Sequence, residues 1–66
     1  MPPLRFPIGT AVQCRVSSGW RSGVVVAHHY REPEWPLEAW APYQIQLDDG
    51  LLIFAPVDDN RCIRAR

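Results

Sequence analysis

The stretch Tyr43-Gln-Ile-Gln-Leu-Asp-Asp-Gly-Leu-Leu-Ile-Phe-Ala55 decides the fold. Its first part alternates apolar and polar residues with a period of two, which is the pattern of an antiparallel strand with one buried face. Residues 51–55 are apolar throughout, so we expect both faces of the return strand to be covered. Asp48-Asp49-Gly50 separates the two runs, and its glycine supplies the positive φ of a tight turn. The stretch therefore predicts the central hairpin of a small barrel.

Length and composition predict a single small domain spanning residues 1–66. A chain this short buries only about 60% of its unfolded surface, which leaves stability marginal unless self-association, a partner or a longer parent chain adds to it. Apolar residues make up 47% of the chain and charged residues 21%, which is a globular rather than a disordered composition. Seven arginines balance seven acids, and a formal net charge of zero disfavours nucleic acid as the partner.

Three further strands are predicted outside the hairpin. Residues 10–16 alternate apolar and polar, residues 24–30 begin with three valines whose branching suits a strand, and a short strand lies near residues 61–64. The segments between strands are an irregular arm over 1–7, a glycine-bounded loop over 17–23, a long loop over 31–42 and one 3₁₀ turn over 55–60. This order predicts an all-β, SH3-like five-stranded barrel, with the long loop between the second and third strands and the 3₁₀ turn before the fifth.

Cys14 and Cys62 are the only cysteines, and their spacing fits no common zinc motif. The first and last strands of such a barrel are commonly neighbours, so either a disulfide or two buried free thiols agree with the sequence. The first five residues lack the apolar core of a secretory leader, which makes an intracellular protein of the cytoplasm or nucleus the default expectation. His28 and His29 are adjacent on a strand and so point to opposite faces, which disfavours a shared metal ion. We expect no cofactor and no metal.

Large aromatic residues are the candidates for ligand binding. The long loop carries Trp35 and Trp40, and a loop of this length in so small a domain usually carries function, although both rings would also serve to pin it to the sheet. Trp20 follows a glycine in the first predicted loop and is placed to fold over one mouth of the barrel. Neighbouring acids would attract a cation to these rings. The candidate ligand-binding residues are Trp20, Tyr30, Trp35, Trp40, Tyr43, Asp48 and Asp49.

Three segments of the chain resemble Tudor-like and Agenet-like barrels. They are Gly9-Thr-Ala-Val-Gln-Cys14 as the opening strand, Gly19-Trp-Arg-Ser-Gly-Val-Val25 as the aromatic step into the second strand, and Leu47-Asp-Asp-Gly50 as the hairpin turn. The fuller pattern looks like a module that recurs in larger algal, fungal and protist proteins; it adds Tyr30-Arg-Glu-Pro-Glu-Trp-Pro36, Ala41-Pro-Tyr-Gln-Ile45 and Leu52-Ile-Phe-Ala-Pro56. The resemblance covers roughly residues 8–64 and implies a barrel fold.

Tudor-family readers hold a methylated lysine or arginine in a cage of three or four aromatic rings. The resemblance therefore implies a peptide partner that carries such a cation, with Trp20 at the family's aromatic position. Other cage positions of the family are occupied here by residues that are not aromatic, namely Arg15, Leu47 and Asp48. A cage in this chain would combine Trp20 with one or more of Tyr30, Trp35, Trp40, Tyr43 and Phe54.

These features favour a non-catalytic interaction module that binds a peptide or a small cationic ligand. One alternative is a structural role, in which exposed aromatics and the arm around Phe6 bury against a second subunit to form a homo-oligomer. Another is single-stranded nucleic-acid binding by stacking on the same rings, which the zero net charge disfavours. No segment predicts an association with a membrane.

A further alternative is an enzyme. The plasmid-borne type II dihydrofolate reductases, which are tetramers with a shared central pore, are similar to this chain at Phe6-Pro-Ile-Gly9, Gly19-Trp20 and Leu52-Ile-Phe54. They line the pore with a Val-Gln-Ile-Tyr segment, where this chain has Leu51-Leu-Ile-Phe54. Because the glutamine and the tyrosine hydroxyl that bind cofactor and substrate are missing, the resemblance implies a shared barrel rather than the activity.

Overall fold

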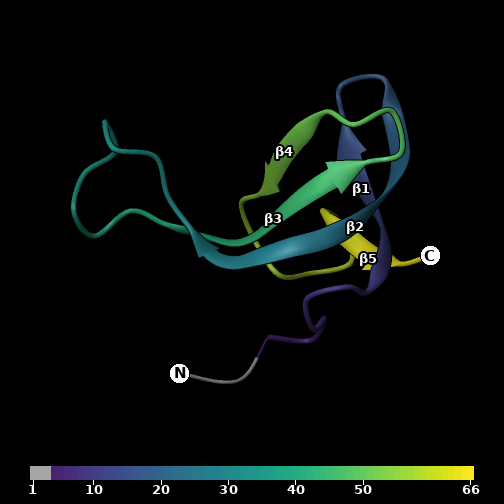
Figure 1. The fold of residues 1–66 in the computed structure, drawn as a ribbon, viewed down its shortest axis with the longest axis horizontal. Coiled ribbons are helices and arrows are strands. Elements are labelled where there is room, and N and C mark those ends of the chain that lie inside the picture. Colours follow the sequence, from purple (N-terminus) through teal and green to yellow (C-terminus); the bar gives the residue numbers. More distant parts are fainter. Residues whose placement is uncertain (1–3) are drawn as a thin grey trace.

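A computed structural model describes residues 4–66, so the first three residues of the predicted arm lie outside the described part of the chain. The fold is all-β, as predicted, and it consists of one sheet of five antiparallel strands (Figure 1). Within residues 4–66 there is no helix of the length and apolar character needed to cross a membrane. The strands are β1 (Ala11–Val16), β2 (Gly19–Tyr30), β3 (Ala41–Leu47), β4 (Leu52–Ala55) and β5 (Ile63–Ala65).

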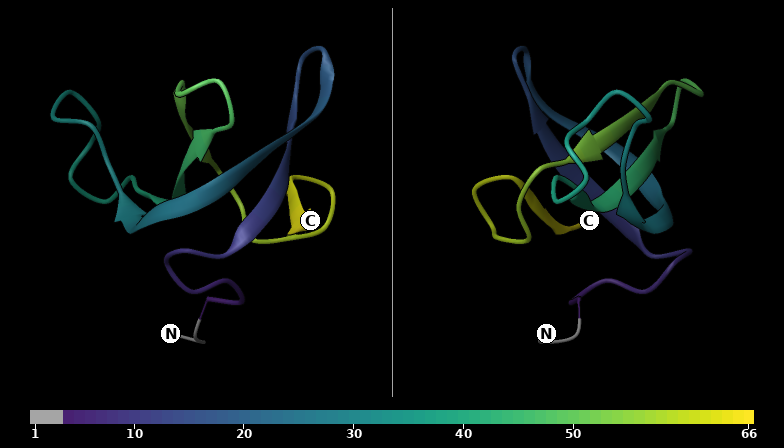
Figure 2. Two further views of the ribbon diagram at one scale, coloured as in Figure 1. Left: turned by 45° about the vertical axis from the view of Figure 1, so that its right-hand side comes forward. Right: turned by 90° about the vertical axis from the view of Figure 1, so that its left-hand side faces the viewer.

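The strands follow one another across the sheet in the order β4-β3-β2-β1-β5. The first four form a meander, and β5 returns to pair with β1 on the far side. The two edge strands, β4 and β5, do not pair with each other, so the sheet is open. The long strand β2 bends along its length. It connects the β1–β2 hairpin with the 31–40 loop, which lie at opposite ends of the molecule (Figures 1 and 2).

The second strand is longer than predicted. It begins at Gly19, and the predicted loop over residues 17–23 is wrong because strand pairing continues to Val16 opposite Gly19. The glycine at position 23 marks a close approach of strands rather than a loop. A Cβ atom there would lie 2.5 Å from the carbonyl oxygen of Gln46 on β3. Trp20 consequently lies in a strand.

The central hairpin has the predicted turn. The amide of Gly50 donates to the carbonyl of Leu47 at 2.8 Å, and Gly50 has a φ of 91°. The amide of Leu47 then donates to the carbonyl of Leu51 at 2.8 Å, which is the arrangement of a three-residue hairpin loop closed by a left-handed glycine. The expectation that both faces of the return strand are covered is wrong. Leu52 is 55% exposed and Phe54 41% exposed, because β4 is an edge strand.

The core lies on the inner face of the bent sheet. Tyr43 is fully buried at its centre, and its hydroxyl accepts a hydrogen bond from the amide of Phe6 at 3.1 Å. This bond ties the N-terminal segment to β3, so the arm contributes a ring to the core. The buried cluster consists of Phe6, Val12, Cys14, Val25, Tyr43, Ile45, Leu47, Ala55 and Ile63.

The segment before β5 differs from the predicted 3₁₀ turn. It is a series of bends followed by a turn in which the amides of Cys62 and Ile63 both donate to the carbonyl of Asp59 at 2.9 Å. The turn places Cys62 against the core, and both cysteines are free thiols. Burial, together with the neighbouring Cys62, raises the pKa of Cys14 to about 11, which keeps this thiol protonated at neutral pH.

Candidate ligand-binding site

The loop between β2 and β3 is folded around the side chain of Arg31. The guanidinium donates hydrogen bonds of 2.7 to 3.1 Å to the main-chain carbonyls of Trp35, Pro36, Leu37 and Ala39. A planar, permanently charged group with five donors can satisfy several carbonyls at once, which a neutral side chain cannot. The loop that projects from the sheet in Figure 1 is thus organised from within.

Three aromatic rings meet between this loop and the edge strand β4. Tyr30 at the end of β2 stacks on Phe54 of β4, with ring centroids 5.8 Å apart and an interplanar angle of 26°. Trp35 of the loop lies edge-on to both rings, 5.8 Å from Tyr30 and 4.9 Å from Phe54. Such pairs stabilise by about 0.5–1.5 kcal/mol each beyond the area that they bury. We call Tyr30, Trp35 and Phe54 the ring cluster; it fastens the loop to β4.

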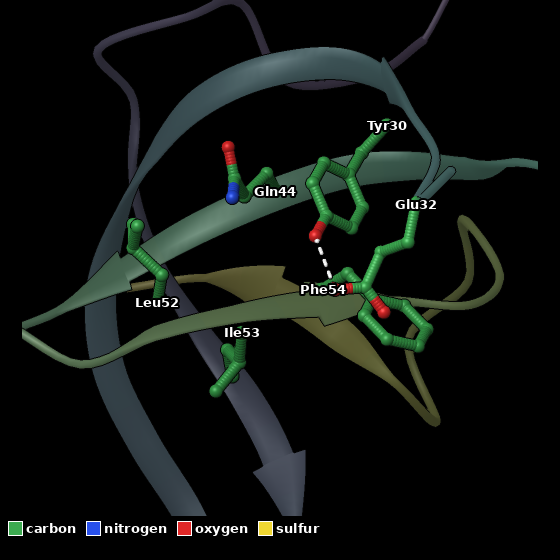
Figure 3. A pocket seen from close by; sticks show the side chains of 6 residues that line it. All are labelled: Tyr30, Glu32, Gln44, Leu52, Ile53 and Phe54. Carbon is green, nitrogen blue, oxygen red and sulfur yellow. Dashed lines mark hydrogen bonds between the residues drawn. The ribbon is translucent and has the colours of Figure 1, made fainter. Parts of the chain in front are cut away.

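A groove runs beside the ring cluster along β4 (Figure 3). It has a volume of about 460 Å³, which is within the range of small-ligand sites. The lining side chains come from the end of β2, the start of the loop, and strands β3 and β4. We call this the β4 groove, and it is lined by Tyr30, Glu32, Gln44, Leu52, Ile53 and Phe54.

The β4 groove carries negative charge. The hydroxyl of Tyr30 donates to one carboxylate oxygen of Glu32 at 3.0 Å (Figure 3). Burial raises the pKa of Tyr30, and the carboxylates of Glu32 and Glu34 raise it further, so the phenol stays protonated and continues to donate. Within residues 4–66, no arginine forms a salt bridge with either glutamate. No ion pair with the described part of the chain therefore neutralises their charges.

The aspartates behave differently from the glutamates. Asp48 and Asp49 were predicted to form a negative rim for a ligand, but Asp48 pairs with Arg66 at 3.0 Å and Asp49 pairs with Arg21 at 2.6 Å. A hydrogen bond from the amide of Leu51, and then the one from Arg21, lower the pKa of Asp49. Neither aspartate lines the β4 groove. Asp49 instead connects the hairpin turn to β2, and Asp48 connects it to the residue that follows β5.

Trp20 lies far from the ring cluster. It sits at the opposite end of the 12-residue strand β2 from Tyr30. Its ring packs under the guanidinium of Arg64, whose central carbon is 3.8 Å from the ring centroid. The structure therefore does not bring Trp20 together with the loop aromatics, as the predicted cage requires.

Two other predicted site residues also lie outside the groove. Tyr43 has no exposed surface, so it reaches no ligand while the core is intact. Trp40 packs against His29, with ring centroids 5.0 Å apart. Of the predicted residues, only Tyr30 and Trp35 belong to the ring cluster, where they meet Phe54.

Sequence reasoning missed several groove residues and one conformational feature. Glu32 was not among the predicted site residues, and the outward-facing Gln44 and Leu52 gave no chemical signal. His29 has a φ of 51°, which interrupts the alternation of β2 immediately before Tyr30. The spacing of Tyr30 and Glu32, two residues apart, is the local signal from which the hydrogen bond between their side chains could have been predicted.

The groove lining offers two oxygen-bearing side chains besides Tyr30, namely Glu32 and Gln44. Among the residues described by the structure, no three histidine, cysteine or acidic side chains gather closely enough to hold a metal ion. Comparison of the chain with protein-family models, with curated proteins and with solved structures gave no match.

Proposed function

We propose that this protein is a non-catalytic interaction module that binds a cationic group, carried by a peptide or a small ligand, in the β4 groove. The observation that carries the proposal is the presence of two aromatic rings, Tyr30 and Phe54, and the Glu32 carboxylate in one ligand-sized groove. The face of an aromatic ring attracts a cation within about 6 Å, and a carboxylate without an ion pair adds to that attraction.

The geometry of the ring cluster indicates how the cation would lie. Tyr30 and Phe54 are stacked with centroids 5.8 Å apart, which leaves no room for a cation between them. The rings therefore form a wall rather than a closed box, and the cation lies against the wall with Glu32 beside it. An open wall of this kind accommodates lysine, arginine or their methylated forms.

We also propose that the fold is an SH3-like barrel of the Tudor-like type. The strand order, the tight β3–β4 hairpin and the long β2–β3 loop support this relationship. On this proposal the ligand site has moved from the Trp20 end of the barrel to the β4 edge. The partner is then an intracellular peptide that carries an exposed or methylated lysine or arginine.

Calorimetric titration with matched peptides tests the proposal. The peptides are identical except at one position, which holds lysine, trimethyllysine or norleucine, an uncharged residue with the same four-carbon chain as lysine. We expect the two cationic peptides to bind and the norleucine peptide to bind at least about tenfold more weakly, as is typical for loss of a cation–ring contact and a charge pair. Equal affinity for the neutral peptide would overturn the proposal.

Variants of the groove locate the binding site. Phe54→Ala removes half of the ring wall and Glu32→Gln removes the charge, and each is expected to weaken binding of the cationic peptides about five- to tenfold. Trp20→Ala is the matched control, because it removes a larger ring at the other end of β2. A Trp20→Ala variant that loses as much affinity as Phe54→Ala would place the site elsewhere.

A further inference from the structure

The outward edge of β5 is closed by the chain itself at Ile63. The amide of Arg15 donates to the carbonyl of Cys62, and the amide of Arg66 donates to the carbonyl of Ala11. Because every second residue of an antiparallel strand bonds to its neighbour, the main-chain groups of Ile63 point away from β1. Its amide donates to the carbonyl of Asp59 at 2.9 Å, and its carbonyl accepts from Arg5 at 3.2 Å. A further strand cannot pair there without displacing these bonds.

The outward edge of β4 is open. The hydrogen bond from Leu47 to Leu51 fixes the ladder, so Ile53 and Ala55 bond to β3 while the main-chain groups of Leu52 and Phe54 point outward. Among residues 4–66, no loop or side chain forms a hydrogen bond with these outward groups of Leu52 or Phe54. The edge therefore presents two residues that are able to pair with another strand.

Side chains do not protect this edge either. Edge strands in soluble proteins usually carry a charge or a proline that prevents pairing with other chains. β5 has Arg64 at its centre, whereas β4 consists of Leu52, Ile53, Phe54 and Ala55 and has neither device. The β4 groove, with its glutamate, lies along the same strand.

We propose that the cationic partner is an extended peptide that adds to β4 as a sixth, antiparallel strand and so delivers its cation to the β4 groove; this inference rests on the proposed function. Charge complementarity selects the occupant. A second copy of this chain would bring another uncharged β4 to the edge. A cationic strand instead brings a positive charge that can pair with the carboxylate of Glu32. Main-chain bonds supply affinity in this mode of recognition, and side-chain positions supply specificity.

The register of β4 specifies the peptide. In an antiparallel pair, residues directly opposite each other point their side chains to the same face. Because Phe54 faces the groove, the cation belongs to the peptide residue opposite Phe54. The next peptide residue lies opposite Ile53 on the core side, and the one after it lies opposite Leu52. The favoured sequence is a lysine or arginine followed by two apolar residues.

Backbone methylation of a synthetic peptide tests this inference. The probe is a blocked peptide with a central lysine-valine-leucine sequence, prepared with an N-methyl group on the lysine, the valine or the leucine. The amides of lysine and leucine would face β4, and the valine amide would face solvent. We expect methylation of lysine or leucine to weaken binding about tenfold or more and methylation of valine to change it less than about twofold.

Amide hydrogen exchange of the protein gives an independent readout. On binding of the unmethylated peptide, exchange at the amides of Leu52 and Phe54 should slow at least about tenfold, because these amides acquire partners. The amide of Ile53, which already faces β3, is the internal control. No variant protein is needed, so misfolding cannot obscure the result.

Each outcome has a definite meaning. Binding that is equally sensitive to methylation at all three positions, or at none, overturns the added strand but leaves the proposed function intact. The single residue trimethyllysine amide serves as a second probe, because it carries the cation but cannot form a strand. If it binds and the peptide does not, the added strand is again overturned and the proposed function stands. Failure of both probes to bind overturns the proposed function as well. A stable dimer in which the amides of Leu52 and Phe54 are already protected from exchange assigns the β4 edge to a second copy of the chain. This result overturns the proposal of a peptide partner.

Discussion

The two edges of the sheet differ in how much of the chain is used to finish them. At β5, Arg5 of the N-terminal segment bonds to Asp58, to Asn60 and to the carbonyl of Ile63, and Arg64 stacks on Trp20. At β4, the strand has apolar side chains, and its outward main-chain groups receive no such bonds within residues 4–66. Under the proposal of an added strand, the closed edge at β5 serves stability and the open edge at β4 receives the partner.

The largest expected difference between the two edges is in how much each contributes to the free energy of unfolding. Ile63 of β5 is fully buried, whereas Leu52 of β4 is 55% exposed. Ile63→Ala should lower the free energy of unfolding by about 2–5 kcal/mol, as is usual for truncation of a buried aliphatic side chain, and Leu52→Ala by no more than about 0.5 kcal/mol. Urea denaturation of the two variants measures this difference. Similar losses would show that β4 stabilises the fold as β5 does.

A smaller effect is expected when β4 receives the type of charge that β5 already has. Leu52→Lys places a cation on the groove face and should weaken binding of a cationic peptide about tenfold through repulsion. Leu52→Glu is the matched variant, with the opposite charge at the same position, and should bind at least as tightly as the natural chain. Both variants should denature at nearly the same urea concentration. If both charges weaken binding equally, the groove does not select its partner by charge.

The smallest effect concerns the ion pair of Arg5 and Asp58 beside β5. Burial by itself would raise the pKa of Asp58, but hydrogen bonds from Arg5 hold that pKa below its usual value. Because the folded-state pKa is lower than the unfolded one, the stabilisation is present above the usual value of about 4 and is lost as pH falls through the folded pKa. Asp58→Asn should lower the free energy of unfolding by about 1 kcal/mol at pH 7, and the difference should shrink below pH 4.

Denaturation at a series of pH values measures this dependence. Asp59→Asn is the control, since Asp59 pairs with Arg61, whose side chain is 89% exposed. Its effect at pH 7 should be smaller than that of Asp58→Asn. A loss that stays constant from pH 7 to pH 3 would mean that Asp58 acts by packing and not by its charge.

Local sequence was a good guide to the strands and a poor guide to the site. The alternation in residues 10–16 and the Asp48-Asp49-Gly50 turn predicted strands and a hairpin that the structure contains. The glycine at 23 was misinterpreted, because a glycine required by a close strand approach has the same local signature as one in a loop. Gly19, with a φ of 122°, begins β2 and does not lie inside a loop that extends to residue 23. Trp20 was consequently assigned to a loop and to the ligand site.

The sequence by itself determined the all-β class, the position of the tight hairpin and most of the inward-facing residues, because these depend on side-chain period and on the φ angle of single residues. Only the tertiary structure decided which rings meet. Tyr30, Trp35 and Phe54 come from two strands and a loop, and they converge because Arg31 gathers the carbonyls of that loop. Contacts between segments far apart in the chain have no local pattern, and the same reason hid the difference between a closed edge at β5 and an open one at β4.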